Sequence, residues 1–111
     1  CSQCRRCHGS AFGSYVEIER SSFEYTSGVN NIKIYPSSNL CERIFCKDCG
    51  SNIMFINKAI PDKYYVSIGV INGNPKLPEA HHIFVGSKAS WDKINDGLKQ
   101  YKEYPINNNN E

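Results

Sequence analysis

Two pairs of cysteines, each separated by two residues, are the side chains best suited to chemistry in this sequence. In the second pair, Cys46 and Cys49 flank two polar residues and are followed by Gly50. Two thiolates at this spacing fit on one tight turn around a metal ion, and zinc is commonly bound in this way. The glycine permits a positive φ and lets backbone N–H groups approach the sulfurs. The pattern predicts a zinc knuckle, which supplies two of four ligands; the alternative is a turn with two buried cysteines and no metal.

The first pair belongs to a cluster at the start of the chain, where Cys1, Cys4 and Cys7 follow one another at intervals of three. This spacing matches the first three ligands of a bacterial iron–sulfur motif, but the fourth cysteine followed by proline is absent. We therefore favour zinc over an iron–sulfur cluster. Arg5 and Arg6 are either solvated charges or groups that lower thiol pKa values and attract an anionic substrate.

The rest of the sequence must position these thiols, and it consists mainly of short runs rich in aromatic and β-branched residues. Seven runs are separated by turn residues: Phe12 to Ile18, Ser22 to Thr26, Ile32 to Tyr35, Arg43 to Cys46, Ile53 to Ile56, Tyr64 to Ile71 and His82 to Val85. Polar and apolar residues alternate in Val66 to Val70, as they do in a strand with one buried face. We expect a mainly β fold with antiparallel sheets.

One short helix is expected near the C-terminal end. Trp91, Ile94 and Leu98 recur at helical spacing, Ser90 can cap the helix, and Gly97 can end it. The length suits one domain, which we place at residues 1–106, and the asparagine-rich residues 107–111 are expected to form a disordered tail. Because the chain starts at a cysteine and not a methionine, we also expect that its N-terminal start is missing.

Several motifs, in order along the chain, resemble one known family. They are Cys1 to Arg6, Gly9 to Phe12, Phe45 to Ser51, Pro78, His82 to Val85 and Lys88 to Trp91. This ordered set is similar to the glutathione-dependent formaldehyde-activating enzyme family, which includes centromere protein V. The resemblance extends from the first residue to about position 105 and implies a β-tent fold that holds two zinc sites.

The resemblance also implies a role for each cysteine pair. Cys1 and Cys4 would bind a catalytic zinc ion with an open coordination position, and Cys46 and Cys49 would bind a structural zinc ion. One catalytic ligand and two structural ligands of the family would precede residue 1. Zinc occupancy is therefore the expectation that depends most on the missing segment.

The implied reaction adds the sulfur of glutathione, or of another small thiol, to the carbonyl of formaldehyde or another small aldehyde, or reverses that addition. Such an enzyme is a carbon–sulfur lyase. We expect Arg5, Arg6 or Lys88 to hold the carboxylates of glutathione. His82 is assigned to the substrate region, where we expect it to hydrogen-bond and orient a loop; general acid–base chemistry is the alternative.

Two further cysteines, Cys7 and Cys41, fall where the family has no fixed ligand, and we expect them to be semi-buried thiols. A competing interpretation of the chain is a non-catalytic zinc module that binds a protein or nucleic acid. The net charge of only +2 argues against nucleic acid. The chain has neither an apolar run long enough to span a membrane nor an N-x-S/T sequon, and the paired spacing argues against disulfides, so we expect a cytoplasmic protein with reduced thiols.

Overall fold

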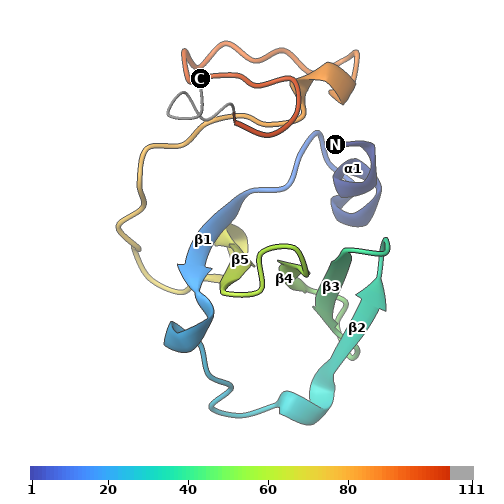
Figure 1. Cartoon of the computed structure of the whole chain (residues 1–111), viewed down its shortest axis with the longest axis vertical. Helices are drawn as coiled ribbons and strands as arrows, with labels where there is room; N and C mark the ends of the chain where they lie inside the picture. Colours follow the sequence, from blue (N-terminus) through green and yellow to red (C-terminus); the bar gives the residue numbers. More distant parts are fainter. Residues whose placement is uncertain (106–111) are drawn as a thin grey trace. The chain divides into compact units, whose positions relative to one another are not determined.

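The computed structural model describes residues 1–105 and divides into two compact units (Figure 1). The sheet unit comprises residues 14–75, and the terminal unit comprises residues 1–13 together with those from 76 onward. Whether both belong to the one domain predicted for residues 1–106 stays a prediction, and the predicted tail at 107–111 lies outside the described residues. In the described part of the chain, every helix is too short to cross a membrane.

The sheet unit is built on five antiparallel strands in the order β1-β5-β4-β3-β2 (Figure 1). The strands are β1 (Tyr15–Glu19), β2 (Ile32–Pro36), β3 (Cys41–Cys46), β4 (Asn52–Asn57) and β5 (Lys63–Ser67). Two 3₁₀ turns, η1 (Arg20–Ser22) and η2 (Val29–Asn31), lie between β1 and β2, and a third, η3 (Ile68–Val70), follows β5. The predicted mainly β, antiparallel fold is confirmed.

The core of the sheet unit lies on the central strands. Ile44 of β3 and Met54 of β4 are direct cross-strand partners and are almost completely buried, and Met54 also pairs with Val66 of β5. Phe55 stacks on Tyr65 and meets the edge of the Tyr15 ring. Cross-strand aliphatic and aromatic pairs of this kind stabilise a sheet more than its hydrogen-bond ladder alone does. They hold β3 and β4 in register as far as Ile44 and Met54; beyond that pair the register shifts, and Phe45 lies opposite Asn52 next to the turn that carries the second cysteine pair.

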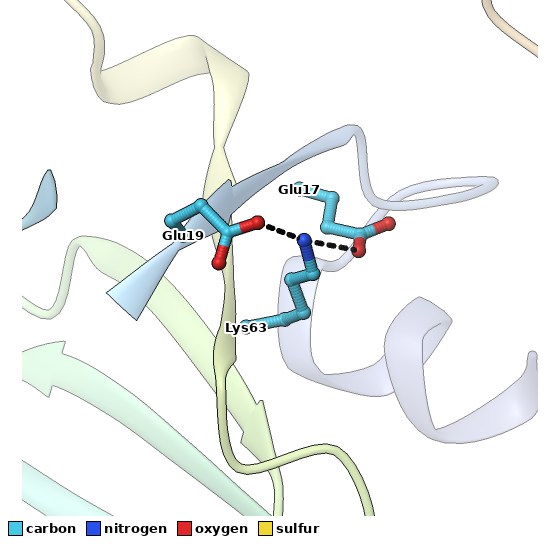
Figure 2. A network of polar contacts seen from close by, with 3 residues as sticks. All are labelled: Glu17, Glu19 and Lys63. Carbon is cyan, nitrogen blue, oxygen red and sulfur yellow. Dashed lines mark hydrogen bonds and ion pairs between the residues drawn. The ribbon is translucent and has the colours of Figure 1, made fainter. Parts of the chain in front are cut away.

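Polar side chains join the outer strand β1 to β5. Lys63 pairs with Glu19 directly across the two strands, and its ammonium group also lies 3.8 Å from a carboxylate oxygen of Glu17, two residues away on the same face (Figure 2). The carboxylates raise the pKa of Lys63, chiefly through the hydrogen bond that the ammonium group donates to Glu19. Because the amine is exposed to solvent, the group sets the register of the strand pair more than it stabilises it.

The terminal unit contains the helix α1 (Ser2–His8) and the 3₁₀ turn η4 (Val85–Ser87). Helix α1 ends at Gly9, which has a φ of 61° and donates its N–H to the carbonyl of Arg5, 2.8 Å away. This left-handed cap is the common way for a helix to end, and basic residues occupy the last turn as the helix dipole favours. The helix was not predicted, although Gly9 and these basic residues were signals for it.

The predicted C-terminal helix is wrong, because residues 90–98 form turns and irregular chain. Trp91, expected to anchor that helix, is 68% exposed. The segment contains Asn95, Asp96 and Gly97, which are poor helix formers, and the carboxylate of Asp96 accepts the backbone N–H of Leu98 at 3.0 Å. This local hydrogen bond competes with a helix that has too few residues to offset the cost of nucleation.

Two of the seven predicted strands are also absent, and the run from Tyr64 to Ile71 is a strand only as far as Ser67, since Ile68–Val70 form η3. The run from Ser22 to Thr26 contributes aromatic contacts but no strand, since Phe23 meets both Tyr25 and Tyr64 edge to face. The run from His82 to Val85 makes one isolated bridge, between His82 and Gln100, before the chain turns. The first run pairs with no strand in the described chain, whereas the second bonds to residues 99–103 without a regular ladder, because Phe84 has a left-handed φ of 55°.

Candidate functional site

The second cysteine pair lies on the turn between β3 and β4. Cys46 is the last residue of β3, and its N–H donates to the carbonyl of Ser51 at 2.9 Å. Gly50 donates its N–H back to the carbonyl of Cys46 at 2.7 Å and has a φ of 79°. The predicted positive φ at this glycine is confirmed. The turn therefore has the backbone of a zinc knuckle, with Cys46 half-buried and Cys49 exposed.

Polar groups of the turn support a charged sulfur at Cys49. Its Sγ lies 3.1 Å from the hydroxyl of Ser51. The pKa of Cys49 is lowered by this hydrogen bond, then by the backbone N–H of Ser51 and by the thiol of Cys46. The two residues between the cysteines are hydrogen-bonded to η2. Lys47 donates its N–H to the carbonyl of Asn31, and the side-chain amide of Asn31 donates to the Asp48 carboxylate. Thiolate is the form of cysteine that binds metal.

A hollow of about 550 Å³ opens beside Cys46 within the sheet unit. Its walls include the aromatic rings of Phe23 and Tyr25 and the side chains of Ile53 and Val70. A volume of this size is ordinary for a site that takes a small ligand or a short piece of chain. Cys46 of the knuckle is therefore one of the residues that line this hollow.

Helix α1 carries the first cysteine pair. Cys1 is the N-cap and Cys4 lies in the first turn, so that their i, i+3 spacing places both on the same face of the helix, and both are half-buried. Cys7, three residues farther on, was expected to be semi-buried, and this is wrong, since Cys7 is exposed near the end of the helix. The spacing was predicted to define a tight turn, and a helix satisfies it as well as a turn does. Cys41, by contrast, lies on β3 and is half-buried, as expected.

The three predicted carboxylate-binding cations differ in their surroundings. Arg5 is half-buried, and its Nε is a buried donor without an acceptor among the described residues. Arg6 is exposed. Lys88 is exposed too, and its Nζ donates to the backbone carbonyl of Asp92 at 2.8 Å. An unsatisfied buried donor is costly, so Arg5 is the cation of the three that is best suited to receive an anionic ligand.

His82 is held by two segments of the terminal unit, residues 96–101 and Phe12. Its Nε2 lies 2.7 Å from Oδ2 of Asp96, its backbone N–H donates to the carbonyl of Lys99, and its own carbonyl accepts the N–H of Tyr101. The edge of its ring meets Phe12 with 6.0 Å between ring centres. The expected hydrogen bonding of His82 is present, and its orientation of a loop in a substrate region stays a prediction. Asp96 was missed; its only sequence signal is the Asp-Gly dipeptide, which indicates a turn and not a partner for a histidine.

The two predicted zinc sites belong to different units of the chain. Cys1 and Cys4 belong to the terminal unit, and Cys46 and Cys49 to the sheet unit. Over residues 1–105, no cluster of three or more His, Cys, Asp or Glu side chains has the geometry to hold a metal ion, and no disulfide joins the six cysteines. Each pair supplies soft sulfur donors that zinc prefers but only two of the four that a closed site needs. The donor chemistry fits zinc, and the ligand count falls short of a complete site.

Comparison with known proteins agrees with these features. The family described as glutathione-dependent formaldehyde-activating enzyme matches residues 1–87. An uncharacterized lyase of the fission yeast Schizosaccharomyces pombe is 30% identical over 73 residues, which are 66% of this chain and 51% of the relative. The chain therefore spans about half the length of this relative. Since the family match includes both cysteine pairs and His82, this chain belongs to the glutathione-dependent formaldehyde-activating enzyme family.

Proposed function

We propose that this chain is part of a lyase that joins a thiol to a small aldehyde and splits the product again, with glutathione and formaldehyde as the expected pair. The observation that carries the proposal is the juxtaposition on α1 of half-buried Cys4 with half-buried Arg5, whose Nε is buried without an acceptor in the described chain. A thiol that bears carboxylates would satisfy that donor. The membership in a family of this activity supports the same conclusion.

The proposed reaction is a simple addition whose atoms balance without a further reactant. The S–H bond of the thiol breaks, a carbon–sulfur bond forms at the carbonyl carbon, and the carbonyl oxygen takes a proton to become a hydroxyl. The reverse reaction breaks the carbon–sulfur bond and restores the thiol and the aldehyde. Arg5 would hold a carboxylate of the thiol through charge-assisted hydrogen bonds, with Arg6 and Lys88 as weaker contributors.

We further propose that the protein depends on zinc. Cys1 and Cys4 would be ligands of one ion, and Cys46 and Cys49 would be ligands of another, with the missing donors supplied from outside the described residues. A zinc ion in the first position would make an incoming thiol more acidic and would polarise the aldehyde oxygen. The proposed setting is the cytoplasm, where cysteines stay reduced.

Matched cysteine variants test this proposal, with Cys7 as the control for Cys4. Both residues lie on α1, three positions apart, but Cys7 is exposed. In the longest natural form of the protein, Cys4→Ser should remove one of two zinc equivalents and abolish formation of the glutathione–formaldehyde adduct. Cys7→Ser should change neither. Retention of both equivalents in Cys4→Ser would refute the ligand assignment, and zinc binding without any turnover in the wild type would favour the non-catalytic module.

A further inference from the structure

The side-chain pair of His82 and Asp96 has the arrangement of a dyad that handles a proton. Their Nε2 and Oδ2 atoms are 2.7 Å apart, and the His82 side chain is only 15% exposed, against 44% for Asp96. The second carboxylate oxygen of Asp96, Oδ1, accepts the N–H of Leu98 at 3.0 Å. Asp96 is thus held at both oxygens, one by the backbone and one by the imidazole.

The charge on Asp96 determines where the imidazole carries its proton. The pKa of Asp96 is lowered, first by the backbone hydrogen bond from Leu98 and then by His82, so the group is a carboxylate at neutral pH. A carboxylate can only accept hydrogen bonds, and therefore Nε2 of His82 must be the donor in both the neutral and the charged form of the ring. In the neutral form the other nitrogen, Nδ1, is left with a lone pair.

The position of the ring is as well defined as its tautomer. The backbone of His82 is bonded on both sides, to Lys99 at 2.8 Å and to Tyr101 at 2.8 Å, and Phe12 covers one edge of the ring. Phe12 follows α1, the helix with Cys1 and Cys4, and belongs to the same unit. Among the contacts found for His82, Asp96 is the charged partner, Phe12 is apolar, and Lys99 and Tyr101 contribute backbone groups.

We propose that His82 is the proton acceptor for the thiol, at Nδ1, and that Asp96 is the positioning residue that keeps the opposite nitrogen protonated. This inference rests on the proposed function. As the S–H bond breaks, the proton passes to Nδ1 and the sulfur attacks the carbonyl carbon. The imidazolium then returns the same proton to the oxygen of the adduct, so that the histidine is unchanged at the end of the cycle.

The tautomer can be measured without substrate. Nitrogen-15 NMR of the histidine side chains distinguishes a protonated Nε2 from a protonated Nδ1. In the wild type, neutral His82 should carry its proton on Nε2, whereas Asp96→Asn should give a mixture, because an amide can either accept or donate. Asp96→Glu should restore part of the preference, which separates loss of the carboxylate from loss of folding. A wild-type protein with its proton on Nδ1 would overturn the proposal.

Turnover as a function of pH tests the acceptor role. At pH 7, His82→Gln should slow adduct formation about 10²-fold, and Asp96→Asn should slow it by a smaller factor. Both losses should shrink above pH about 9, where a free thiol with a pKa near 8.5 ionises without help. His81→Gln and Asp92→Asn are the matched controls and should behave as the wild type does. A loss in His82→Gln that is equal at every pH would identify a purely structural residue and would overturn the acceptor role.

The two hypotheses can fail separately. If the wild-type protein shows no turnover with glutathione and formaldehyde, the proposed function is refuted and the acceptor role is refuted with it. The NMR measurement still decides whether Asp96 fixes the tautomer. If turnover is present but His82→Gln retains it fully at pH 7, only the inference drawn from the dyad is overturned.

Discussion

Substitution of Gly50 by alanine should weaken the knuckle turn through the backbone alone. The residue has a φ of 79°, and a Cβ placed there would meet no atom within 4 Å, so that crowding makes no contribution. A left-handed conformation costs an alanine about 1–2 kcal/mol. The lower entropy of the unfolded alanine chain offsets about 0.4–1 kcal/mol of this. The expected net loss in the free energy of unfolding is therefore about 1 kcal/mol.

The assay is urea unfolding followed by circular dichroism, with reductant and a chelator present so that thiol chemistry and metal do not contribute. Gly69→Ala is the matched control, because Gly69 also has open space around its Cβ position but lacks a positive φ. It should be neutral or slightly stabilising. Gly50→Asn should lose less than Gly50→Ala, since asparagine tolerates the left-handed region. Equal effects of alanine at positions 50 and 69 would refute the reasoning.

Two further predictions concern charged side chains. Arg5→Gln should raise the KM for glutathione roughly 10-fold or more, which is the loss expected for one charged hydrogen bond. The KM for 2-mercaptoethanol, which has no carboxylate, should not change. Arg6→Gln is the control, and equal behaviour of the two variants in steady-state kinetics with both thiols would contradict the assignment. The pKa of Lys63 is raised in the folded state, so its pairing with Glu19 stabilises the fold while the amine is charged. This stabilisation is complete below the ordinary lysine pKa of 10.5 and is lost as the pH rises through the raised pKa of Lys63 in the folded protein. Thermal unfolding of Lys63→Met should therefore lack that alkaline decline, and a decline as steep as in the wild type would contradict the pairing.

The sequence predicted the sheet better than the segments outside it, for a physical reason. The five runs that became strands each find a partner along the chain, and the alternating residues of β3 and β4 converge on Ile44 and Met54. The run from His82 to Val85 has the same composition but only an isolated bridge, because composition indicates the propensity for a strand and does not reveal the left-handed backbone that Phe84 adopts. Sequence patterns indicate local preference, and pairing is a property of the whole fold.

In the candidate site, too, local features were predictable from the sequence and contacts between distant residues were not. The Gly50 turn was predictable because one residue type and one backbone conformation belong together, whereas the Asp96 contact was not, since it joins residues 14 positions apart across an irregular segment. The predicted C-terminal helix failed at this same residue. The Asp96 carboxylate that accepts the N–H of Leu98, a bond that competes with the predicted helix, is also the one that bonds His82.

The two cysteine pairs show what their shared spacing specifies. Cys1 and Cys4 lie at the start of a helix, and Cys46 and Cys49 lie on a turn between strands, yet two intervening residues separate each pair. A helix brings positions i and i+3 to one face, and a tight turn brings the same positions to one end of a hairpin. The spacing therefore specifies that two sulfurs lie close together, whereas the neighbouring sequence determines whether the backbone is a helix or a turn. For this reason a C-x-x-C motif is better evidence for the chemistry of a site than for the secondary structure that carries it.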